Sequence, residues 1–151
     1  MMMKPRSAVG AALVGGVVAT GVLSAVSAAP AAAASACGSG YNLLHSYHIT
    51  PNSNGSGTAY GYLDVYYSPT TRKNCAIARS GGFTYGKLQG AWVLIGKWRG
   101  GGEDDDGWGS TYKYYAGPVY TYAPNECIWA QGMVRYNNTY YKRSTGAIAC
   151  N

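Results

Sequence analysis

Side chains with polar groups alternate with apolar ones along much of this chain. This period of two most constrains the fold that the chain can adopt. The segment 59–67, AYGYLDVYY, shows the pattern well. One side of this predicted strand carries three tyrosines and one aspartate, namely Tyr60, Tyr62, Asp64 and Tyr66. The other side carries Leu63 and Val65, and apolar spacing typical of a long amphipathic helix is missing.

Further β-prone segments follow, and clusters of Gly, Pro, Asn and Ser separate them, as at 50–57, 68–71 and 80–82. The predicted strands cover 74–79, 90–99, 110–115, 119–122, 127–136, 140–142 and a short piece at 147–150. Many short strands with such punctuation predict an all-β fold, a small antiparallel β-sandwich or barrel.

The first 36 residues have the composition of a secretory signal peptide. A basic start precedes an apolar run at 8–26, and small-residue motifs follow at 26–28 (VSA) and 34–36 (ASA). These motifs predict cleavage after about residue 28 or 36, with a membrane anchor as the competing interpretation. The remainder, 37–151, has the length of a single secreted domain.

All four cysteines follow the leader, and an even count in an exported chain predicts two disulfides. They are Cys37, Cys75, Cys127 and Cys150. A zinc site would be expected to contain a close C-x-x-C pair, and the sequence has none. Three pairings are possible, of which Cys37–Cys75 and Cys127–Cys150 are favoured because they tie each end of the domain to a nearby strand.

Four of the six carboxylates lie together within the segment 100–110, GGGEDDDGWGS. They are Glu103, Asp104, Asp105 and Asp106. Glycines on both sides favour a solvated hairpin loop. A weak calcium site and a partner-binding role are the alternatives, but the acids are consecutive, whereas a calcium loop alternates its ligands. A catalytic carboxylate pair would need a more rigid position than a glycine-rich loop provides.

Groups suited to catalysis are scarce in this sequence. The histidines, His45 and His48, would point to opposite sides of a strand, and no G-x-S-x-G elbow occurs. The cysteines are expected to be oxidised. The sequence therefore predicts no catalytic residue, no metal site and no cofactor, and hence a protein that is not an enzyme.

Tyrosine is the most distinctive residue type, with 15 in the chain, and among the aromatic residues only Phe83 lacks a polar group. Tyrosine can pack through its ring and still hydrogen-bond a partner, so it serves either cross-strand packing or binding. The candidate binding face comprises Tyr60, Tyr62, Asp64 and Tyr66. Because burying an unpaired Asp64 would be costly, we expect this face to point outward and Leu63 and Val65 inward.

Several motifs resemble the spore-associated protein A family, small secreted proteins of Streptomyces and related actinomycetes. They are CGSGYN at 37–42, KNC at 73–75, and YYAGPVYTYAP at 114–124 followed by CIW at 127–129. The resemblance covers most of the chain after the leader and departs at 87–108. It implies an exported protein found with aerial hyphae and spores, and it brings no catalytic residues.

The sequence thus predicts a secreted, non-enzymatic protein associated with the spore or aerial-hypha envelope, which binds cell-wall or spore-surface polymer. A carbohydrate-binding module for wall glycan is one alternative. A secreted inhibitor or antimicrobial protein is another. Lysine and arginine form no large cluster, so nucleic acid is not an expected partner. Membrane contact is expected only through the signal peptide before cleavage.

Overall fold

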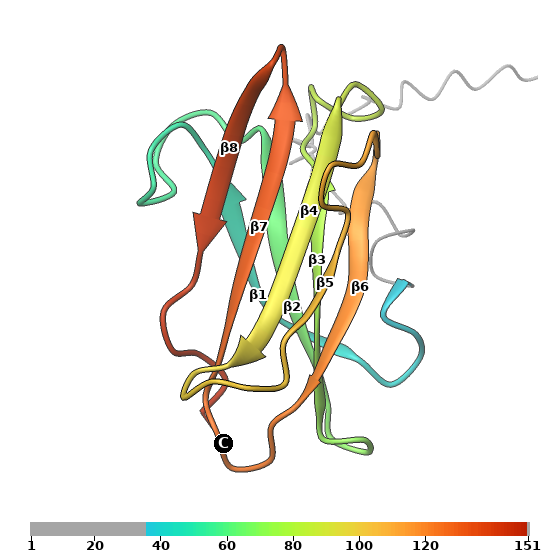
Figure 1. Cartoon of the computed structure of the whole chain (residues 1–151), viewed down its shortest axis with the longest axis vertical. Coiled ribbons are helices and arrows are strands. Elements are labelled where there is room, and N and C mark those ends of the chain that lie inside the picture. Colours follow the sequence, from blue (N-terminus) through green and yellow to red (C-terminus); the bar gives the residue numbers. More distant parts are fainter. Residues whose placement is uncertain (1–35, 151) are drawn as a thin grey trace, which may run out of the picture.

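The structure is a computed structural model that describes residues 36–150. The predicted signal peptide therefore lies outside the described residues, except for Ala36. Two antiparallel four-stranded sheets pack face to face (Figure 1). The first sheet contains, in spatial order, β1 (Asn42–Ile49), β2 (Gly61–Ser68), β3 (Lys73–Ser80) and β6 (Tyr115–Tyr122). The second contains β5 (Asp104–Asp106), β4 (Gly90–Lys97), β7 (Ile128–Tyr136) and β8 (Thr139–Ser144).

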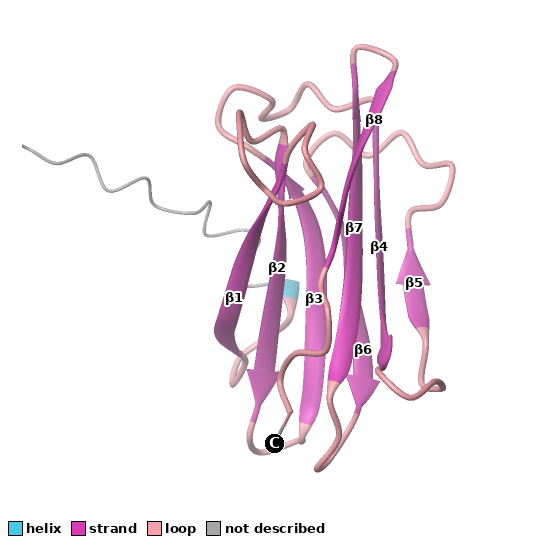
Figure 2. Cartoon of the chain, turned by 90° about the vertical axis from the view of Figure 1, so that its left-hand side faces the viewer, coloured by secondary structure: helices cyan, strands magenta, loops and turns pink. Residues whose placement is uncertain are grey.

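This architecture confirms the predicted all-β fold and decides between its two forms. Each sheet has two edge strands, β1 and β6 in one layer and β5 and β8 in the other, and each edge strand pairs with a neighbour on one side only. The molecule is therefore a sandwich and not a closed barrel. Figure 2 shows the two layers from the side. None of the described residues forms a helix long and apolar enough to cross a membrane.

The inner faces of the sheets meet in one apolar core. Leu63 and Val65 of β2 are fully buried there, as the alternation predicted, and Val93 and Ile95 of β4 are buried with them. Gly132 of β7 lies at a close approach of the two layers, because a Cβ atom there would come within 3.2 Å of Leu63. The core therefore depends on the period-two pattern of both sheets.

Both disulfides join the pairs favoured from the sequence. Cys37–Cys75 ties the segment before β1 to β3, and Cys127–Cys150 ties the end of the chain to the start of β7. Near the second disulfide, Ile128 and Ile148 exchange backbone hydrogen bonds, so the predicted strand at 147–150 is reduced to a single bridge. The first and last parts of the described residues are thereby fixed to opposite sheets.

One strand prediction and one loop prediction were wrong. Residues 110–114 form bends and irregular backbone, and the regular strand starts only at Tyr115 and continues through Gly117 and Pro118 to Tyr122. The acidic segment, expected to be a solvated loop, contains the short strand β5, which pairs with β4. Local alternation did not reveal β5, because three consecutive aspartates between glycines show no period-two pattern and the strand is defined by its pairing with β4.

The aspartates of β5 connect the two layers at one side of the sandwich. β6 is an edge strand, and backbone N–H groups on its free side need acceptors. Asp106 accepts a hydrogen bond from the Gly117 amide at 2.7 Å, and Asp104 accepts one from the Tyr120 amide at 2.8 Å. Asp105 points the other way, toward the outer face of the second sheet.

We predict that Asp104 and Asp106 stabilise the fold and that Asp105 contributes less. Changing both Asp104 and Asp106 to Ala should lower the free energy of unfolding by about 1–3 kcal/mol, since two edge amides would lose charged acceptors. Asp105→Ala is the matched control. Urea unfolding followed by tryptophan fluorescence measures the difference, and equal midpoints for the double variant and the wild type would show that these aspartates are merely solvated.

Candidate functional site

The predicted tyrosine face is not an exposed row. Asp64 is only 1% exposed and Tyr66 only 4%, so the expectation that this whole face lies open to solvent is wrong. Tyr66 packs with Ile77 against the Cys37–Cys75 disulfide. The segment leading into β1 thus covers this end of the outer face, and only Tyr60 and Tyr62 remain partly exposed.

Asp64 is buried together with hydrogen-bonding and charged partners. The Arg79 Nε atom lies 2.5 Å from the Asp64 Oδ2 atom, and the Ser46 hydroxyl donates to the Oδ1 atom at 2.5 Å. The Arg79 guanidinium also lies over the ring of Tyr62, 4.3 Å from its centroid. The sequence argument treated Asp64 as unpaired, and these cross-strand partners are why the expected exposure is wrong.

The remaining tyrosine of the predicted face has a different position. Tyr60 stacks on Tyr141 of β8, with ring centroids 3.9 Å apart and planes 10° from parallel. This contact bridges the two layers at the end of the sandwich.

Among residues 36–150, no three His, Cys, Asp or Glu side chains gather as a metal-binding group. Both His45 and His48 are exposed on β1, and the His48 ring lies edge-on to Tyr62.

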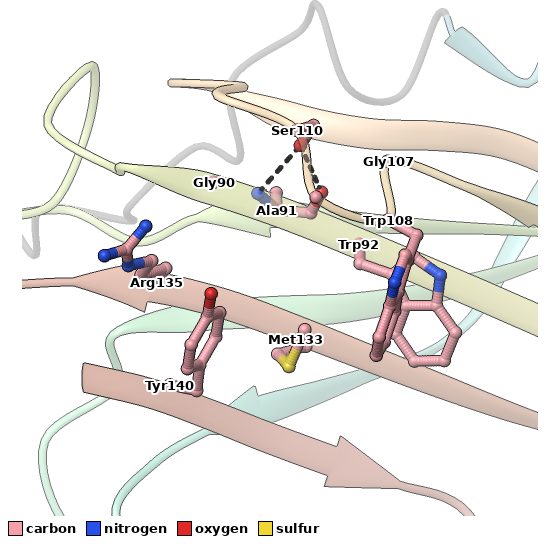
Figure 3. Close-up of a pocket in the computed structure, with 10 residues that line it drawn as sticks. Gly90, Ala91, Trp92, Gly107, Trp108, Ser110, Met133, Arg135 and Tyr140 are labelled. Atoms are coloured by element: carbon pink, nitrogen blue, oxygen red, sulfur yellow. Dashed lines mark hydrogen bonds between the residues drawn. The ribbon is translucent and has the colours of Figure 1, made fainter. Parts of the chain in front are cut away.

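A concave site lies instead on the outer face of the second sheet, with a volume of about 430 Å³. Its walls are tryptophans on one side and Arg135 and Tyr140 on the other, with Met133 between them (Figure 3). We call it the tryptophan groove, lined chiefly by Trp92, Trp108, Ser110, Met133, Arg135 and Tyr140.

Strand register brings these residues together. Trp92 of β4 is opposite Met133 of β7, and Gly90 is opposite Arg135, which in turn is opposite Tyr140 of β8. Residues paired in this way point to the same face of an antiparallel sheet. Because Gly90 has no side chain, the Ser110 backbone can approach β4 here, where a Cβ atom would come within 2.6 Å of the Ser110 carbonyl oxygen.

The segment after β5 places the second tryptophan. The Ser110 hydroxyl donates to the Ala91 carbonyl at 2.8 Å, which holds this segment against the edge of β4. Trp108 lies edge-to-face with Trp92, with ring centroids 5.5 Å apart and an interplanar angle of 78°. Trp92 is buried and donates from Nε1 to Asp105 at 3.2 Å, whereas Trp108 is 75% exposed. The exposed Trp108 ring is therefore held against the buried, hydrogen-bonded indole of Trp92.

Arg135 supplies positive charge on the opposite wall. One guanidinium nitrogen, Nη2, donates to the Asn138 side chain at 3.0 Å, and the group lies 5.4 Å from the Tyr140 ring centroid. The Nε atom is buried without a hydrogen-bond partner among the described residues. Lys142 is exposed on β8, directly opposite Met133. The groove thus combines apolar rings with cationic donors, a combination suited to binding a ligand that has both an apolar face and polar edges.

The tryptophan groove was not among the predicted sites. The signal for it was present in the tryptophans between residues 87 and 108. Their convergence could not be predicted, because Met133, Arg135 and Tyr140 come from strands far along the chain.

No family model matches this chain, and neither a curated protein nor a solved structure of significant similarity is found. The class defined by the fold and the groove is a disulfide-linked β-sandwich with an aromatic outer face.

Tyr66 should make the domain sensitive to high pH. Burial, helped by the nearby Asp64 carboxylate and opposed by Arg79, raises the pKa of Tyr66 to about 12. In the unfolded chain the tyrosine pKa is about 10, so the stability contributed by neutral Tyr66 is full below pH 10 and is lost as the pH rises toward 12.

We predict that Tyr66→Phe reduces the fall in unfolding free energy across this interval. Denaturant unfolding at closely spaced pH values measures the change. Tyr122→Phe, at an exposed position on β6, is the control. An unchanged pH dependence in Tyr66→Phe would show that other groups govern alkaline stability.

Proposed function

We propose that this protein is an exported, non-enzymatic binding protein that attaches to cell-envelope glycan through the tryptophan groove. The observation that carries the proposal is the exposed Trp108 ring, held by Trp92 beside a cationic wall. A large aromatic side chain left exposed in a preformed concavity marks a binding site more often than a packing defect.

Glycans match the chemistry of this groove. A pyranose ring has a face of C–H groups, which packs against an aromatic ring, and hydroxyl groups around its edge, which need hydrogen-bond partners. Trp108 and Tyr140 offer exposed rings, and Arg135 offers donors next to them. Tryptophan and tyrosine also lose little conformational freedom when they bind, which favours recognition by a shallow surface.

Export supports an envelope location. Two disulfides are consistent with an extracellular protein, since such bonds persist in oxidising compartments. The leader sequence and the resemblance to spore-associated proteins support attachment to the spore or aerial-hypha surface of an actinomycete. Under this proposal the protein coats wall material and does not degrade it.

We predict that Trp108→Ala lowers retention on purified cell-wall glycan by about tenfold or more, because the largest open ring of the groove is lost. The fold should be unaffected, since the side chain is mostly exposed. Co-sedimentation with peptidoglycan, chitin and spore walls measures retention.

The matched control is Tyr122→Ala, which removes an exposed aromatic side chain from the other sheet. Equal retention of the wild type and Trp108→Ala would contradict the proposal, as would equal losses in both variants.

A further inference from the structure

We infer that the ligand is a linear glycan with acidic substituents, which lies along β4 and β7 from the tryptophan groove to a second aromatic platform at Trp129. The inference rests on the proposed function and extends it, because it specifies the shape and charge of the ligand. The groove alone would suit a short sugar, whereas the platform beyond it requires a longer chain.

The second platform is built on a glycine. Trp129 of β7 is opposite Gly96 of β4, and a Cβ atom on Gly96 would come within 3.0 Å of the Trp129 indole nitrogen. The indole therefore lies across the backbone of β4 where any side chain would displace it. Trp129 remains partly exposed, and Trp98, just after β4, is 53% exposed.

The two platforms share one face of the sheet at a suitable separation. Trp92 and Gly96 are four residues apart on β4, so they point to the same side and lie roughly 13 Å apart at about 3.3 Å of rise per residue. That distance corresponds to roughly two to three sugar rings. An aromatic contact at each end would hold a linear chain along the strands.

Polar side chains lie between the platforms. Gln131 of β7 and Ser144 of β8 are opposite each other, and Asp105 is opposite Leu94 on the other side of the same row. The Gln131 amide donates to the Ser144 hydroxyl at 2.5 Å, which leaves the Gln131 carbonyl as an acceptor for ligand hydroxyls. The order along the sheet is thus aromatic, polar, aromatic.

Charge complementarity favours an acidic ligand. Arg135 and the exposed Lys142 both lie at the groove end of this face. Two carboxylates border this face. Asp105 accepts a hydrogen bond from Trp92. Glu103, which lies beside Gly96 at the Trp129 end, accepts one from the Gly101 amide. The acidic substituent is therefore assigned to the groove end of the face, away from Glu103. A carboxylate on the glycan could reach the Arg135 guanidinium, where charged hydrogen bonds are stronger than neutral ones.

The test compares ligand lengths in wild-type protein and in two variants. The probes are the disaccharide and the hexasaccharide from peptide-free peptidoglycan strands, which carry lactyl carboxylates, with neutral chito-oligosaccharides of the same lengths. Isothermal titration calorimetry gives each affinity. We expect the wild type to bind the acidic hexasaccharide at least about tenfold more tightly than the disaccharide.

Trp129→Leu should abolish this length dependence while leaving disaccharide binding unchanged, whereas Trp108→Ala should weaken binding of both lengths. Leucine keeps an apolar contact with β4 but removes the flat ring, and thermal unfolding checks the fold. If Trp129→Leu does not fold, Gln131→Ala at the middle of the face replaces it and should reduce the same length dependence. Arg135→Gln should remove the preference for acidic over neutral chains.

The outcomes separate the inference from the proposed function. Equal affinity for short and long chains in the wild type would overturn the second platform while leaving glycan binding in place. No preference for acidic chains would overturn the assigned ligand charge. Binding of none of the four oligosaccharides would overturn both the inference and the proposed function, and would direct the search to a protein partner for this face.

Discussion

Burial of the two inner sheet faces against each other is the constraint on which the rest of this molecule depends. Leu63 and Val65 from one layer meet Val93 and Ile95 from the other, and Gly132 allows the layers to approach closely. Strict alternation then sends every second side chain outward. Each sheet therefore has an outer face, and the two outer faces differ in how far they are covered by other residues.

The outer face of the first sheet is largely closed. The segment held by the Cys37–Cys75 disulfide packs on Tyr66, and Asp64 pairs with Arg79 beneath Tyr62. The outer face of the second sheet has no comparable cover among the described residues, and its tryptophans remain in part accessible. This asymmetry explains why Tyr66 contributes to packing on the first sheet, while Trp92 and Trp108 supply the candidate site at the second.

The edge strand β5 connects the two layers and also supports the tryptophan groove. β5 uses its alternation for two purposes, since Asp104 and Asp106 accept hydrogen bonds from β6 while Asp105 holds the indole of Trp92. A strand of three residues therefore connects the layers and also supports one wall of the tryptophan groove. This arrangement also occupies part of the free edge of β6, where unpaired amides would otherwise invite association with another strand.

The sequence by itself determined the fold class, the inward direction of Leu63 and Val65, and the presence of two disulfides, because alternation and cysteine count are local or compositional properties. Only the tertiary structure decided which outer face stays open. It paired Asp64 with Arg79, formed β5 from a segment expected to be a loop, and gathered Trp92, Trp108 and Arg135 around one groove. Alternation shows which residues share a face. Whether that face is covered depends on strand register and on contacts between residues far apart in the chain, which no local pattern encodes.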